Sequence, residues 1–124
     1  MKVIIDTHVL FWALAEDIKR LSPKALQIIN NSESLILPSI VLLELLGLLE
    51  KKQKMSYFDN FIKNIPNSKY VIVSLDIAVL KETRLLKDKL ELHDRVIVAT
   101  AKLLRLSLIT KDEQITDVYK KVIW

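Results

Sequence analysis

Val3-Ile4-Ile5-Asp6-Thr7-His8-Val9 begins with three β-branched residues and then changes abruptly to an acidic residue. Consecutive β-branched residues favour a strand, and the lack of a polar residue among them indicates burial on both faces. Residues 9–15 then have the pattern of a helix. The opening therefore predicts a strand, an acidic turn and a helix, and a strand of this kind is typical of the centre of a parallel sheet.

The alternation of strand and helix patterns continues along the chain. Further strand patterns occupy residues 35–37, 70–73, 106–110 and 122–124, and helix patterns occupy residues 24–30, 39–53, 57–65, 76–89 and 94–105. Ser22 and Ser39 are expected to cap the helices that they precede. Because strands alternate with helices and no linker interrupts them, we expect residues 1–124 to form a single three-layer α/β/α domain with a mainly parallel sheet of about five strands.

The composition excludes several classes of protein. Hydrophobic residues make up 51% of the chain, with one Gly and no Cys. One Gly cannot build the phosphate loops of dinucleotide-binding or P-loop proteins, and the lack of Cys excludes thiolate metal sites. The most apolar window, residues 35–49, is interrupted by Pro38 and Glu44 and is too short to span a membrane. Without a visible secretory signal, the protein is expected to be cytoplasmic.

Four acidic residues follow or interrupt these apolar stretches: Asp6, Glu44, Asp94 and Asp112. Asp6 and Asp112 stand at the ends of strand patterns, Glu44 lies about one and a half turns into a helix, and Asp94 is expected to open another. A carboxylate beside buried apolar surface is costly unless it is hydrogen-bonded, paired or bound to a cation. Because ligands bind beyond the carboxyl ends of parallel strands, we expect the four carboxylates to share one site.

Glu44 has the weakest structural explanation of the four. Its helical neighbours are Ile40, Val41, Gly47 and Leu48, so we expect a buried side chain. Gly47 is the only Gly of the chain and is unfavourable within a helix, so we expect it to permit close approach of another backbone.

The other three carboxylates have simpler explanations as helix caps or strand ends, so the prediction depends on their convergence. Oxygen ligands without Cys or a pair of His favour Mg²⁺ or Mn²⁺ over Zn²⁺. Such an ion supports hydrolysis of a phosphodiester. The chain has 19 Lys and Arg against 15 Asp and Glu. If four acids occupy one pocket, the remaining surface is strongly basic and attracts a polyanion.

These residues carry a resemblance to the PIN domain, and among PIN domains the chain is similar to the VapC-type ribonuclease toxins of bacterial toxin-antitoxin pairs. The matching segments span nearly the whole chain, in the order of the family: Ile4-Ile5-Asp6-Thr7-His8-Val9-Leu10-Phe11-Trp12, Pro38-Ser39-Ile40-Val41-Leu42-Leu43-Glu44, Asp94-Arg95-Val96-Ile97-Val98-Ala99-Thr100-Ala101 and Leu108-Ile109-Thr110-Lys111-Asp112. No single motif is specific, whereas four in register are.

The resemblance implies that Asp6, Glu44, Asp94 and Asp112 are catalytic residues that bind Mg²⁺ or Mn²⁺. It also implies that Thr7, Ser39 and Thr110 support them from nearby. The family further implies cleavage of RNA, a homodimer, and a cognate antitoxin whose segment occupies a groove near the site. The helix at residues 42–49 suits such a partner. The sequence leaves open whether Asp117 or Arg95 joins the site and whether one or two ions bind.

Other functions remain as alternatives. The chain is also compatible with a housekeeping PIN nuclease of RNA processing, or with a PIN domain that binds RNA or protein without cutting. A receiver domain would need an acidic pair after the first strand, and a haloacid-dehalogenase-type phosphatase would need an Asp where His8 stands. Structural roles are favoured for His8 and His93. Trp12 and Trp124 are interpreted as packing anchors, because basic and aromatic residues do not surround them.

Overall fold

Five strands form one sheet in the computed structural model, which describes residues Met1–Trp124. Their order is β3-β2-β1-β4-β5, and every neighbouring pair is parallel. The bounds are β1 (Lys2–Ile5), β2 (Ser34–Pro38), β3 (Tyr70–Val73), β4 (Ser107–Ile109) and β5 (Val122–Ile123). The predicted parallel sheet of five strands is confirmed, with β1 at its centre.

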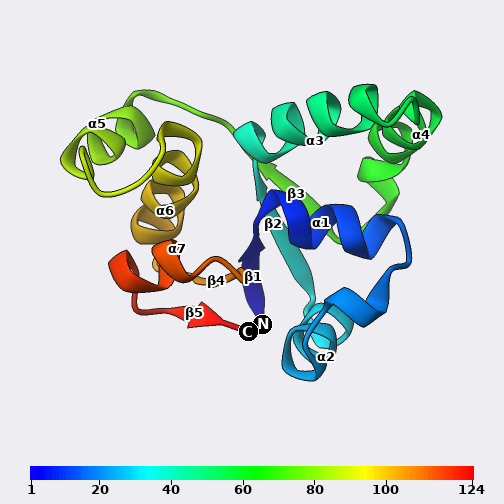
Figure 1. Ribbon diagram of the computed structural model, residues 1–124, viewed down its shortest axis with the longest axis horizontal. Coiled ribbons are helices and arrows are strands. Elements are labelled where there is room, and N and C mark those ends of the chain that lie inside the picture. The colour runs from blue at the N-terminus through cyan, green and yellow to red at the C-terminus, as the bar shows by residue number, and fades with distance from the viewer.

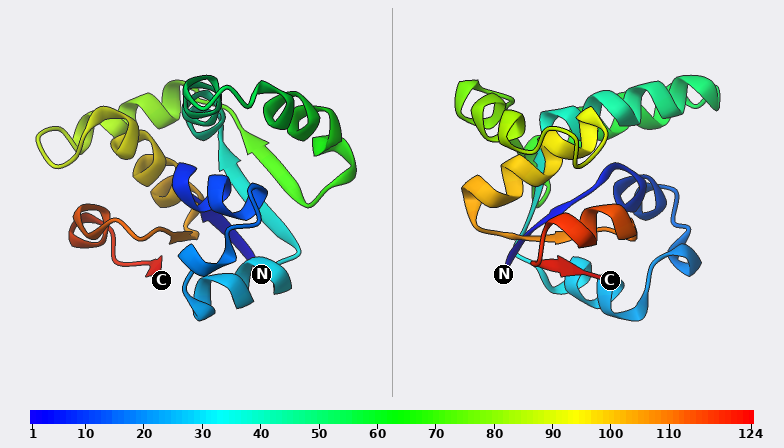
Figure 2. Two further views of the ribbon diagram at one scale, coloured as in Figure 1. Left: turned by 45° about the vertical axis from the view of Figure 1, so that its right-hand side comes forward. Right: turned by 60° about the vertical axis from the view of Figure 1, so that its left-hand side comes forward.

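Seven α-helices and two short 3₁₀ helices connect the strands (Figures 1 and 2). Their bounds are α1 (Thr7–Leu14), η1 (Ile18–Arg20), α2 (Pro23–Asn31), α3 (Ser39–Lys51), α4 (Met55–Asn64), η2 (Ile65–Asn67), α5 (Ile77–Leu85), α6 (Leu92–Leu104) and α7 (Glu113–Val118). Most helices agree with the predicted ranges to within about two residues. There are two exceptions: α5 ends at Leu85 because residues 86–89 form a turn, and no helix range was predicted for α7.

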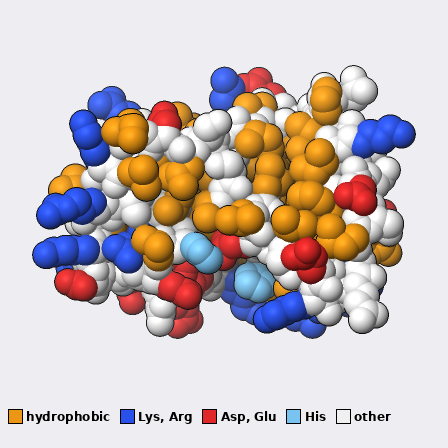
Figure 3. Space-filling view, turned by 90° about the horizontal axis from the view of Figure 1, so that it is seen from above, with side chains coloured by type: hydrophobic (Ala, Val, Ile, Leu, Met, Phe, Trp, Pro, Cys, Tyr) orange, Lys and Arg blue, Asp and Glu red, His pale blue; other side chains and the backbone are white.

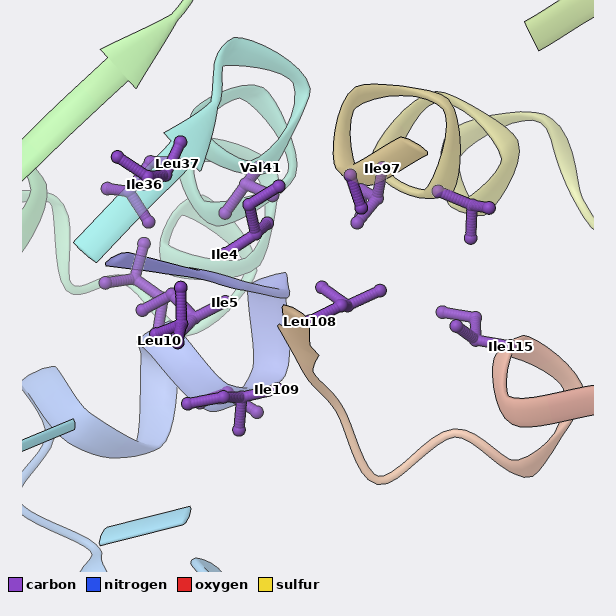
Figure 4. Close-up of a cluster of buried hydrophobic side chains, with 14 of the residues drawn as sticks. Ile4, Ile5, Leu10, Ile36, Leu37, Val41, Ile97, Leu108, Ile109 and Ile115 are labelled. Carbon is purple, nitrogen blue, oxygen red and sulfur yellow. The ribbon is translucent and has the colours of Figure 1, made fainter. Parts of the chain in front are cut away.

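The hydrophobic core lies on both faces of the sheet, as expected for three layers. Figure 4 shows Leu10 of α1 on the same side of β1 as Ile5, and Ile97 of α6 on the other side with Ile4. Residues Val3, Ile4 and Ile5 are completely buried. Two-sided burial explains why the first strand is β-branched at every position.

Two predicted helix starts need correction, whereas Ser22 caps α2 as expected by accepting a hydrogen bond from the Ala25 N–H at 3.0 Å. Ser39 is not a cap. The helix α3 follows β2 directly, so Ser39 is already helical, and its hydroxyl instead accepts a hydrogen bond from the Leu75 N–H at 3.1 Å. Asp94 does not open α6, because that helix begins at Leu92.

The strand order reverses at β1 and β4. The connection from β1 leads to β2 on one side, whereas the connection from β4 leads to β5 on the other. These two strands are paired, with Ile5 opposite Ile109, so their carboxyl ends lie together. The crevice beyond such ends is where open α/β sheets bind ligands. None of the helices is long and apolar enough to cross a membrane.

Candidate active site

The four predicted carboxylates line one pocket at the carboxyl edge of the sheet. The pocket has a volume of about 620 Å³, and its lining includes Asp6, Glu44, Asp94 and Asp112. They come from the end of β1, from α3, from α6 and from the segment after β4. The fold therefore brings together residues that are far apart in sequence, as predicted from the strand order.

Asp6 follows β1 and caps α1. Its Oδ1 accepts a hydrogen bond from the Val9 N–H at 3.0 Å, and its Oδ2 accepts one from the Thr110 hydroxyl. Burial raises the pKa of Asp6, while the hydrogen bonds from Thr110 and Val9 act in the opposite direction. Two donors thus hold this carboxylate in place at the pocket.

Glu44 is held from two sides on the pocket face of α3. The Thr7 hydroxyl donates to its Oε1 at 2.7 Å, and His93 Nδ1 lies 3.3 Å from its Oε2. The side chain is 27% exposed, so the prediction of a buried Glu is wrong. The interpretation of Gly47 is also wrong, because Gly47 is exposed and a Cβ there would meet nothing within 4 Å.

Asp94 is the third residue of α6, and it accepts no hydrogen bond from the protein. Its pKa is raised to about 6, first by burial and then by the negative charges of neighbouring carboxylates, with Asp112 and Glu44 foremost. Both effects favour the protonated form of an acid. Asp94 is therefore the member of the group whose charge is least compensated.

Asp112 follows β4 and caps the short helix α7. Its Oδ1 accepts a hydrogen bond from the Gln114 N–H at 2.8 Å. Its own N–H donates to the Thr110 hydroxyl oxygen at 3.1 Å. Because Thr110 also donates to Asp6, one buried hydroxyl links the segments that carry two of the carboxylates.

Not every predicted neighbour reaches the site. Thr7 and Thr110 contact the carboxylates, as expected, whereas the hydroxyl of Ser39 is bound to the backbone elsewhere. Arg95 does not line the pocket and has a buried Nε without a hydrogen-bond partner. Asp117 is exposed on α7 and lines a different pocket.

Sequence reasoning assigned no role in the site to six further residues that line the pocket: His8, Trp12, Glu91, Ile97, Lys111 and Glu113. The acidic residues lie within three positions of Asp94 or directly after Asp112. This proximity was the available signal. In total, six carboxylates and one Lys line the pocket, so it is strongly acidic.

The chemistry of this donor set fits a hard divalent cation, because carboxylate oxygens are the ligands that Mg²⁺ and Mn²⁺ prefer. In their present orientations, however, no group of three or more acidic or His side chains is placed to hold a metal ion jointly. Asp6, Glu44 and Asp112 instead point at hydrogen-bond donors of the protein.

The sequence and the fold match one known family. A model of the PIN domain family matches residues 3–121. No curated protein sequence matches the chain.

Three solved structures are similar over nearly the whole chain. A toxin-antitoxin complex from Klebsiella pneumoniae is 21% identical, with 98% of this chain and 96% of that chain covered and a TM-score of 0.73. VapC20 from Mycobacterium tuberculosis, a toxin that cleaves the sarcin-ricin loop, is 11% identical, with 94% of each chain covered and a TM-score of 0.73. DNA-bound VapBC from Salmonella typhimurium is 15% identical, with 98% and 95% covered and a TM-score of 0.73. At these identities the similarity shows the fold, and the match of the family model over residues 3–121 shows that the chain belongs to the PIN domain family.

Proposed function

We propose that this PIN domain is a divalent-metal-dependent endoribonuclease that hydrolyses phosphodiester bonds of RNA. The observation that carries the proposal is the convergence of Asp6, Glu44, Asp94 and Asp112 on one pocket, together with the raised pKa of Asp94. The raised pKa means that the charged form of Asp94 is unfavourable in the folded protein, and a bound cation would offset this cost. Strongly perturbed groups in a cleft are typical of functional sites.

The four carboxylates would hold Mg²⁺ or Mn²⁺. When bound, the ion supplies Lewis-acid chemistry that offsets charge on the phosphate and makes water a better nucleophile. The protein itself orients the ligands: Thr110 positions Asp6, and Thr7 positions Glu44. The oxygens of Asp94 have no protein donor and are available to a ligand in the pocket. Thr7 and Thr110 thus support the carboxylates, whereas Ser39 is not proposed to act.

RNA as the substrate is supported by the distribution of charge. The pocket is acidic, but the chain as a whole has a net charge of +4, so its remaining surface is basic. Such a surface attracts a polyanion, while the acidic pocket concentrates cations at the point of cleavage. The similar toxin VapC20 is described as cleaving the sarcin-ricin loop. A nuclease function is therefore the one that the pocket and the family favour together.

We also propose that the chain is the toxin of a type II toxin-antitoxin pair in the cytoplasm. The similar structures from Klebsiella pneumoniae and Salmonella typhimurium are toxin-antitoxin complexes. A groove of about 250 Å³ adjoins the active site along α3, and its lining is Thr7, His8, Glu44, Gly47, Leu48, Lys51 and His93. It shares Thr7, His8 and Glu44 with the active-site pocket. A segment of an antitoxin seated in this groove would cover Glu44 and block the pocket.

A homodimer is supported by exposed apolar side chains near the start of α3, α5 and α6. Leu43, Leu75, Ile77 and Leu92 are 41–66% exposed. The hydrogen bond from Leu75 to Ser39 and the contact of His93 with Glu44 bring their segments together. Figure 3 shows hydrophobic side chains across this face beside the two His. An exposed apolar patch of this kind is typical of an interface, and we propose a second copy of the chain as its partner.

Cleavage of RNA by the purified protein tests the proposed activity. Cleavage is expected with Mg²⁺ or Mn²⁺, and it should disappear with a chelator or with Asp6→Asn or Glu44→Gln. Asp59→Asn is a matched control, because Asp59 is exposed on α4 and lies outside the pocket. Robust cleavage in the chelator would exclude the metal-dependent mechanism. Unimpaired cleavage by Asp6→Asn or Glu44→Gln would exclude the assignment of these residues.

Two further observations separate a toxin from a housekeeping PIN nuclease. A toxin is expected to arrest growth on induction, and RNA ends sequenced after induction should show new cleavage sites. Co-expression of the product of an adjacent small gene should restore growth and inhibit the purified enzyme. Growth that is unaffected by the active enzyme would favour the housekeeping function.

A further inference from the structure

One apolar side chain is accessible within the otherwise polar active-site pocket. Of the residues that line the pocket, only Ile97 and Trp12 are hydrophobic. Ile97 is 1% exposed and belongs to the core. Trp12 is half-buried, with part of its indole at the pocket. A ligand that enters the pocket therefore meets a single apolar surface, which is the indole of Trp12.

The indole of Trp12 is held within a row of aromatic rings. His8 lies one helical turn before it on α1, with ring centroids 5.9 Å apart and ring planes inclined by 48°. Trp124 directly follows β5. Its ring centroid lies 6.2 Å from that of Trp12, and the two ring planes are inclined by 55°. Both Trp side chains pack against the hydrophobic core. Because the core fixes Trp12, little conformational entropy is lost when a flat ligand packs on it.

The charge of the pocket makes an uncharged contact valuable for an RNA substrate. Six carboxylates and one Lys line the pocket, so it repels a phosphate backbone until cations are present. Stacking of a base on an aromatic side chain contributes roughly 1–3 kcal/mol per base and does not depend on the charge of the pocket. A nucleobase is therefore the part of RNA that this pocket can hold without a cation.

We propose that Trp12, flanked by His8, forms a subsite in which a base of single-stranded RNA stacks beside the catalytic carboxylates. Trp12 lies six residues after Asp6 in the sequence, which corresponds to roughly 9 Å along the axis of α1. This separation suits the base of a nucleotide that flanks the phosphate under attack. The proposal rests on the proposed endoribonuclease function, and it adds a role to Trp12 beyond the expected packing.

Binding of two RNA probes tests the subsite. The probes are a labelled single-stranded RNA octamer and an abasic octamer with the same ribose-phosphate backbone, each bound to the Asp94→Asn protein with Mg²⁺ present. Trp12→Leu is expected to weaken binding of the octamer about 5- to 150-fold, the equivalent of roughly 1–3 kcal/mol. Trp12→Phe should retain most of the affinity. Neither change should alter binding of the abasic octamer.

Phe11→Leu provides a matched control, because Phe11 is a half-buried aromatic residue of the same helix that lies outside the pocket. It should leave the affinity for both octamers unchanged. A second readout leaves Trp12 intact: in Trp124→Phe, Trp12 is the only Trp of the chain. Its fluorescence should be quenched by the octamer and not by the abasic octamer. This measurement holds even if Trp12→Leu fails to fold.

The subsite is overturned if Trp12→Leu binds the octamer as tightly as the parent protein. It is also overturned if the fluorescence of Trp12 stays constant at saturating RNA, or if neither octamer binds. Failure of the proposed function is distinguishable, because it is scored by RNA cleavage with the unaltered chain. Cleavage without a stacking signal overturns the subsite alone, whereas stacking without cleavage overturns the nuclease and leaves a base-binding pocket.

Discussion

Replacement of Asp94 by Asn is expected to stabilise the metal-free protein while it abolishes cleavage. No group of the protein donates a hydrogen bond to the Asp94 carboxylate. Burial, together with the charges of Asp112 and Glu44, raises its pKa to about 6. The charged carboxylate is therefore unfavourable in the folded protein. Asparagine has nearly the same shape and no charge, so it removes the repulsion without opening a cavity.

The structure sets the size of this effect. The difference between the ordinary value of 3.8 and a pKa of about 6 corresponds to about 3 kcal/mol, at about 1.4 kcal/mol per pH unit. Asp94 is half-buried, so solvent screens part of the repulsion from its neighbours. We therefore expect Asp94→Asn to raise the free energy of unfolding by about 1–2 kcal/mol at pH 7.5.

The effect should depend on pH with a definite sign. Between pH 3.8 and about 6, the folded protein binds more protons at Asp94 than the unfolded chain does. The parent protein therefore loses stability as the pH rises through this window. The Asn variant lacks this titration, so the difference in unfolding free energy between the two proteins should grow from near zero at pH 4 to its full value above pH 7.

Urea denaturation at pH 4.0, 5.5 and 7.5 in a chelator measures this difference, with Asp59→Asn as the control for an exposed carboxylate. Addition of Mg²⁺ should stabilise the parent protein more than the Asp94→Asn variant. An Asn variant that is less stable than the parent at pH 7.5 would refute the reasoning. A stability gain of the same size at all three pH values would refute the assigned cause.

Three other substitutions test separate parts of the structure. Thr110→Val removes a buried hydroxyl that donates to Asp6 and accepts from the Asp112 N–H. The free energy of unfolding, measured by urea denaturation, should therefore fall by about 2–4 kcal/mol. A loss below about 0.5 kcal/mol would contradict these contacts. Gly47→Ala should raise the free energy of unfolding by roughly 0.5–1 kcal/mol, because the site is helical and open; destabilisation would indicate a steric clash. Leu43→Asp should convert a dimer into a monomer in light scattering, and an unchanged mass would place any dimer interface elsewhere.

The arrangement of the sheet was predictable from local patterns. Val3, Ile4 and Ile5 are apolar because the central strand is covered on both faces, and the structure confirms their complete burial. Convergence of Asp6 and Asp112 followed from a general property of parallel sheets, in which the carboxyl ends share one edge. Such predictions depend on the order and type of elements, which the pattern of residues conveys well.

The ends of helices and the partners of side chains were less predictable. Ser39 has a residue type suited to capping, but α3 begins too early for it to cap. Asp94 was expected to open α6, but the helix begins at Leu92. A cap depends on the backbone angles of one residue, and these are set by the way each strand enters its helix. Composition and spacing do not contain that information.

The burial of Glu44 was misjudged for a related reason. A helix that is apolar almost all round does not reveal which of its faces is covered. In the structure, Leu45 is completely buried while Leu43, two positions before it, is 60% exposed. Glu44 lies at the boundary between these faces, and Gly47 is exposed. Of the helical neighbours that indicated burial of Glu44, Ile40 and Val41 are buried, whereas Gly47 is exposed, so only one side of Glu44 is covered.

The structure also changes which carboxylate, Glu44 or Asp94, is the better indicator of a bound cation. From the sequence, Glu44 was the hardest of the four to explain without a cation, whereas Asp94 could be explained as a helix cap. In the structure, Glu44 accepts a hydrogen bond from Thr7 and contacts His93. Asp94 caps nothing and faces like charges. The protein supplies no partner for the charge of Asp94, although this charge lowers its stability. Asp94 is therefore a stronger indicator of a bound cation than Glu44.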